Sequence, residues 1–121
     1  MATALIVEDV QIDRLIMTNY LESAGWIVVM VTTGEEALAY LSNRKPDIVF
    51  LDVVLPGRSG FEICRNIKSQ VDTKKIPVVI CSTKNTDMDR FWGLKQGADL
   101  YLTKPVDRTD LLETLQRLVK F

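Results

Sequence analysis

The sequence predicts an α/β fold, in which one sheet of five parallel strands is flanked by five helices. Five short runs rich in Val and Ile alternate with five segments of helical period. The runs are mostly uninterrupted, which is typical of strands covered on both faces. The links between segments are short. Strict alternation of this kind favours a doubly wound sheet, and we expect the strand order 2-1-3-4-5.

The individual elements follow from local patterns. The predicted strands are 4–7, 27–31, 48–51, 77–81 and 100–102, and the predicted helices are 11–24, 34–43, 59–70, 86–96 and 107–120. Gly25 and Gly97 suit the ends of the first and fourth helices. Thr33, followed by two acids, suits the start of the second. In the fourth helix we expect positions 88, 91 and 94/95 to form a buried stripe, with Trp92 beside it and partly exposed.

Composition indicates one globular domain spanning 1–121. Of 121 residues, 47% are hydrophobic, and the net charge is -1. That charge carries no signature of direct nucleic-acid or membrane binding, and no apolar run is long enough to cross a bilayer. A signal peptide's basic start is missing. Cys64 and Cys81 are too few for a disulfide framework, so we expect reduced core thiols in a cytoplasmic protein.

The chain contains no histidine. This excludes His-based triads, histidine general bases and histidine metal ligands. It also means that any phosphohistidine donor must come from a partner protein.

Polar side chains follow the strands at the edge of the predicted sheet where ligands bind in parallel α/β folds. These residues are Glu8, Asp9, Asp52, Ser82, Thr83, Thr103 and Lys104, and Pro105 follows Lys104. Three carboxylates in one pocket repel each other, and a hard cation such as Mg²⁺ relieves this repulsion. Asp52 could then act as a nucleophile towards a phosphoryl group, with Lys104 pairing to a phosphoryl oxygen and Ser82 donating a hydroxyl.

Each of these residues also has an ordinary structural interpretation. An acid such as Asp9 after a strand is usually a helix cap or a solvated loop residue, a lone Lys104 usually lies on the surface, and Ser82 and Thr83 could cap the fourth helix. Asp52 differs because it ends an apolar strand, where an unpaired carboxylate is costly. The joint pattern favours the functional interpretation.

Four stretches together carry a family resemblance: LIVEDV at 5–10, PDIVFLDVVLPGRSGFE at 46–62, IPVVICSTK at 76–84 and GADLYLTKPV at 97–106. With these stretches the chain resembles the response-regulator receiver domain, the CheY-like family of two-component signalling. The resemblance covers nearly the whole chain. It implies a flavodoxin-like fold and a phospho-accepting switch.

The resemblance implies a role for each site residue. Asp52 matches the phosphoacceptor and Lys104 the phosphate-binding lysine, usually in a cis bond to Pro105. Asp9 matches the direct Mg²⁺ ligand, Glu8 its partner through water, and Val54 a backbone-carbonyl ligand. Ser82 and Tyr101 match the switch pair, and Pro56 and Gly60 match the turn after the acceptor strand.

Several positions depart from the commonest family pattern. Glu8 replaces an Asp, Thr83 a small Ala, and Leu100 a frequent acid, while Val54 is apolar. Thr83 and Val54 stand where side chains influence hydrolysis of the acyl phosphate.

The resemblance also implies partners. A histidine kinase or phosphotransfer protein would supply the phosphoryl group, and a downstream protein would bind a face made by the fourth helix, fifth strand and fifth helix. Trp92, Tyr101 and Val106 are the predicted residues of that face. We expect a monomer or a phosphorylation-dependent dimer. The short form suggests a stand-alone receiver of chemotaxis or twitching-pilus type.

Three alternatives remain open. The chain could be a receiver cut from a larger transcriptional regulator, or a pseudo-receiver that only binds. It could also be an Asp-nucleophile phosphatase of the haloacid-dehalogenase type, but the second acid which those enzymes need is Val54 here. We therefore expect no enzyme activity beyond the chain's own phosphorylation and dephosphorylation.

Overall fold

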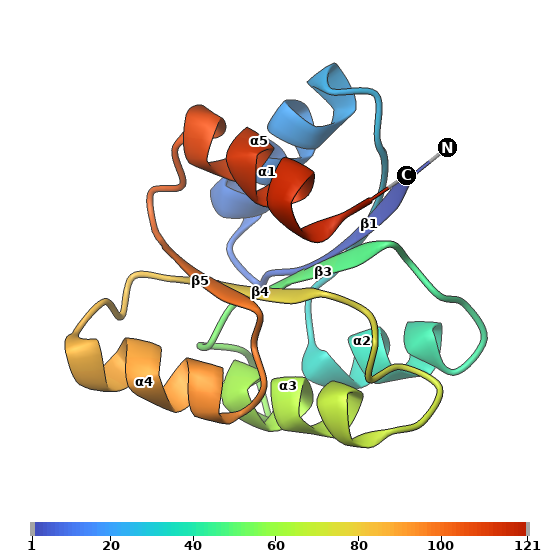
Figure 1. Ribbon diagram of the computed structural model, residues 1–121, viewed down its shortest axis with the longest axis vertical. Coiled ribbons are helices and arrows are strands. Elements are labelled where there is room, and N and C mark those ends of the chain that lie inside the picture. The colour runs from blue at the N-terminus through green and yellow to red at the C-terminus, as the bar shows by residue number, and fades with distance from the viewer. Residues whose placement is uncertain (1, 121) are drawn as a thin grey trace.

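The computed structural model describes residues 2–120 as one five-stranded parallel sheet between two layers of helices (Figure 1). The strands are β1 (Thr3–Val7), β2 (Ile27–Val31), β3 (Ile48–Leu51), β4 (Val78–Ser82) and β5 (Leu100–Thr103), and their order is β2-β1-β3-β4-β5. The helices are α1 (Gln11–Ser23), α2 (Gly34–Leu41), α3 (Gly60–Ser69), α4 (Asp87–Lys95) and α5 (Arg108–Leu118). The predicted fold class, strand order and ten elements are confirmed, with ends shifted by two residues at most.

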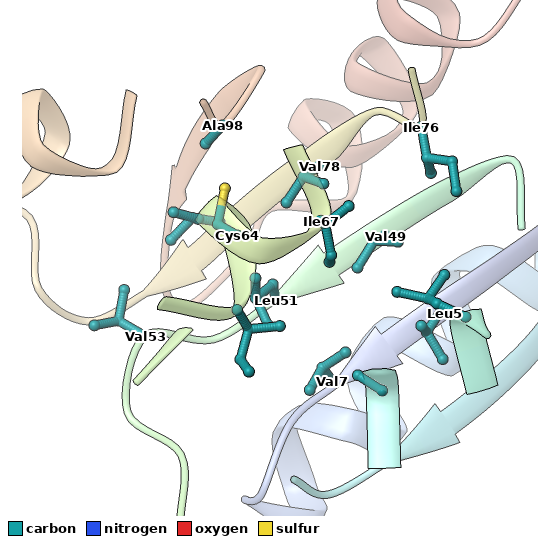
Figure 2. Close-up of a cluster of buried hydrophobic side chains, with 14 of the residues drawn as sticks. Leu5, Val7, Val49, Leu51, Val53, Cys64, Ile67, Ile76, Val78 and Ala98 are labelled. Carbon is teal, nitrogen blue, oxygen red and sulfur yellow. The ribbon is translucent and has the colours of Figure 1, made fainter. Parts of the chain in front are cut away.

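The sheet separates two apolar clusters because successive side chains of a strand point to opposite faces. Figure 2 shows one cluster, in which Leu5, Val7, Val49, Leu51 and Val78 pack with Cys64 and Ile67 of α3. The other cluster packs beneath α1 and α5 and includes Ile6, Phe50, Val79 and Leu111. The central strands therefore read as continuous apolar runs. Cys64 and Cys81 are both free and buried, as predicted.

The register of the sheet brings the strand ends together at one edge. Val7 at the end of β1 pairs with both Val31 and Leu51, and Ser82 pairs with Thr103. The Asp52 N–H extends this pattern by donating to the Val7 carbonyl at 3.0 Å. Residues that directly follow β1, β3, β4 and β5 therefore meet at this edge.

The buried stripe predicted for α4 is wrong. Met88, Phe91 and Leu94 are 70%, 58% and 51% exposed, and Gly93 is the buried residue of this helix. The residue of α4 that faces the sheet is Gly93, which has no side chain. The pattern of apolar residues in the sequence therefore cannot mark this position as buried. The visible apolar positions therefore mark the outer side of α4. Trp92 is half exposed, as predicted.

Within residues 2–120, no helix is long and apolar enough to span a membrane.

Candidate functional site

An ion cluster lies at the edge where the strands end. Glu8 and Asp52 are 4% and 7% exposed, and the Lys104 side chain reaches both carboxylates. Its Nζ contacts Glu8 Oε1 and lies 3.1 Å from Asp52 Oδ2 and 3.0 Å from Asp13 Oδ2. Two of the predicted site carboxylates, Glu8 and Asp52, therefore meet the ammonium group of the predicted Lys104. Asp13, which was not predicted from the sequence, is a third carboxylate in contact with this group.

The charges of this cluster depend on each other. Burial raises the pKa of Glu8, against the opposing effect of hydrogen bonds from Lys104 and the Val10 N–H. Burial works against the charged form of Lys104, but its hydrogen bonds to Glu8 and Asp13 raise the pKa of the ammonium above its ordinary value. Lys104 is therefore held as a cation, and it compensates the carboxylates that the fold has removed from water.

The loop between β1 and α1 is held by hydrogen bonds from Arg14, which was not predicted as a site residue. Arg14 donates from Nη1 to the backbone carbonyls of Glu8 and Asp9, each at 2.9 Å. Asp9 itself is exposed. Within residues 2–120, no group of three acidic or cysteine side chains converges closely enough to hold a metal ion through those side chains alone.

The loop after β3 is held close to α3. Asp52 Oδ1 accepts a long hydrogen bond of 3.4 Å from the Val54 N–H, and the Gly60 N–H donates to the Val53 carbonyl at 2.8 Å. A Cβ at Gly60 would collide with the Asp52 carbonyl group. A glycine is thus needed where α3 begins, because the backbone of the Asp52 loop fills the adjacent space. The Val54 side chain is 58% exposed.

Ser82 at the end of β4 and Tyr101 in the neighbouring strand β5 share Lys84 as a partner. Ser82 is fully buried, and its Oγ accepts from the Lys84 N–H at 3.2 Å. Tyr101 is 7% exposed, and its hydroxyl donates to the Lys84 carbonyl at 2.5 Å. Burial raises the pKa of Tyr101, although a hydrogen bond with Ser82 opposes this. Thr83, which lies between Ser82 and Lys84 in the chain, is exposed.

The residues predicted for the partner face differ in exposure. Trp92 is 49% exposed, but Tyr101 is 7% and Val106 is 8% exposed. Val106 packs with the cluster beneath α1 and α5 and so belongs to the core in this conformation. The preceding Lys104–Pro105 bond is cis, as expected. Of the three, Trp92 therefore offers the largest accessible surface.

Comparisons with known proteins agree with this architecture. The chain is 40% identical over 119 residues to Protein PilH of Pseudomonas aeruginosa, covering 98% of both chains. It is similar to the chemotaxis protein CheY4 of Vibrio cholerae, with a TM-score of 0.91, 32% identity and coverage of 98% of this chain and 99% of that one. The receiver domain of sensor histidine kinase PA1611 from P. aeruginosa, solved with a magnesium ion in its active-site cleft, superposes with a TM-score of 0.90 at 28% identity, covering 97% and 96%.

Other curated relatives are longer proteins, of which this chain spans about a quarter to a half. The family described as response regulator receiver domain matches residues 4–116, which is nearly the whole chain. The protein therefore belongs to the response regulator receiver domain family.

Proposed function

We propose that this protein takes a phosphoryl group onto Asp52 from a histidine kinase or phosphotransfer protein and acts as a signalling switch. The observation that carries the proposal is the carboxylate of Asp52, which is 7% exposed at the end of β3 with the Lys104 ammonium 3.1 Å away. A carboxylate can attack phosphorus to form an acyl phosphate. Lys104 lies beside one oxygen of the Asp52 carboxylate, and in this proposal its ammonium would pair with a phosphoryl oxygen.

The residues at this edge fit a Mg²⁺ ion. Glu8, Asp9 and Asp52 would supply carboxylate oxygens and Val54 a backbone carbonyl, and the related PA1611 receiver holds magnesium in its cleft. Mg²⁺ usually keeps several waters and binds through one or two carboxylates, so it does not need three converging side chains. When bound, the ion would neutralise charge on the phosphoryl group being transferred.

The switch would act through Ser82 and Tyr101. Phosphorylation would favour the arrangement in which the Ser82 hydroxyl bonds the phosphoryl group and Tyr101 is buried, which is a shift between two conformations. α4, β5 and α5 would present this change to a downstream protein, with Trp92 as the exposed anchor. We expect a monomer, or a dimer formed on phosphorylation, that binds neither nucleic acid nor membrane directly.

The site favours a carrier of phosphate over a general phosphatase. Hydrolysis by phosphatases with an Asp nucleophile needs an acid or base two residues later. That position is Val54, whose side chain cannot transfer a proton. The chemistry would therefore be limited to the chain's own phosphorylation and dephosphorylation. The likeness to the chemotaxis protein CheY4 supports a role in motility, of chemotactic or twitching-pilus type, and we expect the protein to act in the cytoplasm.

Intact-mass spectrometry tests the proposal directly. The protein is incubated with Mg²⁺ and acetyl phosphate, and we expect one added phosphoryl group on the wild type and none on Asp52→Asn. Asp72→Asn, an exposed acid on another part of the surface, is the matched control and should be phosphorylated normally. An unmodified wild type would support a pseudo-receiver, and repeated hydrolysis of varied phosphate esters would support a phosphatase.

A further inference from the structure

Gly93 lies in the interior of α4 and faces the ring of Tyr101. A Cβ at this position would be 2.9 Å from Cδ2 and 3.0 Å from Cε2 of Tyr101, and 3.2 Å from Cδ1 of Ile80. Approaches this close require a neighbouring atom to move. The ring therefore occupies space that any other residue at position 93 would fill.

A glycine at position 93 makes α4 less stable than most other residues would. Glycine in a helix interior is about 1 kcal/mol less favourable than alanine, because the unfolded chain loses more freedom on folding. α4 has nine residues, and Gly93 is its buried residue. The glycine therefore lowers the stability of α4 at the position where this helix packs against the sheet. The close fit of the Tyr101 ring is a steric reason for this residue.

Arg90 holds the same ring from another side. Its guanidinium carbon lies 5.4 Å from the ring centroid of Tyr101, within the range of a cation–π interaction. The guanidinium also donates to the Tyr101 carbonyl at 3.3 Å and to Thr103 Oγ1 at 2.5 Å. Because the guanidinium is bonded to β5 at two points, it stays in place over the ring.

The hydroxyl of Tyr101 completes the arrangement. It donates to the Lys84 carbonyl at 2.5 Å, so the polar end of the buried ring is satisfied. Arg90 thus contacts both the ring and the backbone carbonyl of Tyr101, Gly93 lies against the ring, and the Lys84 carbonyl accepts from the hydroxyl.

We propose that Gly93 and Arg90 are positioning residues that hold Tyr101 in its buried conformation before phosphorylation. The buried conformation of Tyr101 would therefore already predominate in the unmodified protein, and phosphorylation would stabilise it further. The consequence for signalling rests on the proposed function. If burial of Tyr101 and phosphorylation favour each other, the coupling is reciprocal, so a variant that expels the ring should bind a phosphoryl group less favourably.

Fluorine NMR of the unmodified protein labelled with 3-fluorotyrosine tests the position of the ring. The Tyr101 resonance is identified by its loss in Tyr101→Phe. We expect one wild-type resonance that is insensitive to exchange of H₂O for D₂O. In Gly93→Ala we expect a second, solvent-sensitive resonance that takes a large share of the intensity. Leu94→Ala, next to it on the exposed side, is the matched control and should leave the resonance unchanged.

Arg90 is tested in the same way with two variants. Arg90→Gln should give partial solvent sensitivity of the Tyr101 resonance, and Arg90→Lys, which keeps a cation near the ring, should restore the buried signal in part. Equal effects of the two variants would overturn the role of the charge.

Thermal unfolding separates the steric role from a general effect on α4. Gly93→Ala should lower the unfolding midpoint in the wild type but raise it in a Tyr101→Ala background, where the ring is absent, the contact with Ile80 Cδ1 needs only a small shift, and the gain in helix propensity dominates. The same sign of change in both backgrounds would overturn the proposal for Gly93.

These measurements are independent of phosphate chemistry. A buried wild-type resonance together with failure of acetyl phosphate to modify Asp52 would contradict the proposed function but leave the positioning of Tyr101 standing. A solvent-exposed wild-type resonance in a protein that is phosphorylated normally would overturn the inference alone.

Discussion

Helices α3 and α4 cover the same face of the sheet side by side but are attached to it in different ways (Figure 1). α3 buries Ile63, Cys64 and Ile67. α4 buries Gly93 and leaves Met88 and Phe91 mostly exposed. Apolar burial therefore holds α3 firmly, whereas α4 depends on one tyrosine ring and a few polar contacts. An element with few buried apolar contacts opens or shifts at low cost, so α4 is suited to report a change at the site and α3 to support the site.

The two glycines of these helices show the same contrast. A Cβ at Gly60 of α3 would meet the backbone of Asp52, but a Cβ at Gly93 of α4 would meet a side chain. The backbone of Asp52 directly follows the central strand β3, so it cannot move without disturbing the sheet. The ring of Tyr101 can instead rotate away. The fit at Gly60 thus fixes the position of Asp52, and the fit at Gly93 controls a group that moves.

The largest expected difference lies between Ile67→Ala in α3 and Phe91→Ala in α4. Ile67 is 1% exposed, so its truncation leaves a cavity and should lower the free energy of unfolding by about 2–5 kcal/mol. Phe91 is 58% exposed, and its truncation should cost about 0.5 kcal/mol or less. Urea unfolding followed by circular dichroism measures both. Similar losses for the two variants would contradict the contrast between the helices.

Gly60→Ala should come next, with a loss of about 1–3 kcal/mol in the free energy of unfolding, because a methyl group is forced against backbone. Phosphorylation of Asp52 by acetyl phosphate should also slow, since the loop that carries its carboxylate must shift. Gly93→Ala serves as the comparison and should destabilise less. If Gly60→Ala were as stable as the wild type, the loop would be more adaptable than these contacts indicate.

The thiol of Cys64 gives α3 a pH dependence. Burial raises the pKa of Cys64 to about 11, from an ordinary value of about 9. A raised pKa contributes stability below pH 9, and this contribution is lost as pH rises through 11, because the unfolded thiol ionises first. By pH 10 the loss should be about 1 kcal/mol.

Urea unfolding of the wild type and Cys64→Ala from pH 8 to 10 isolates this effect from the other titrating groups. The stability of the wild type should fall more steeply with pH than that of the variant. Parallel pH profiles would show that the thiol does not titrate differently in the folded state.

The smallest effect on stability should come from Trp92→Ala in α4. Trp92 is 49% exposed, so we expect a change within about 0.5 kcal/mol and unchanged phosphorylation of Asp52. Binding to the downstream partner should weaken, because an exposed tryptophan is a favoured anchor at interfaces. Val71→Ala, an exposed apolar residue away from α4, is the control for affinity measurements. Unchanged affinity for the partner would remove Trp92 from the proposed face.

Much of the site was predictable because parallel strands end at one edge. Glu8, Asp52, Ser82 and Lys104 each follow or end a strand, so the fold alone brings their backbones together. Asp13 was not predictable in this way. It belongs to the first turn of α1, and its contact with Lys104 depends on how that helix lies against the loop after β5.

The sequence by itself determined the alternation of strands and helices, the apolar centre of the sheet and the edge where the charged residues gather. These features follow from local periodicity and from the geometry of parallel strands. The tertiary structure alone decided which side of α4 faces the sheet, the burial of Tyr101 and the capture of Lys104 by three carboxylates. The physical reason is that a periodic pattern records the side chains of one segment. It does not record the space that a neighbouring element leaves, and at Gly93 the decisive feature is a side chain that is missing.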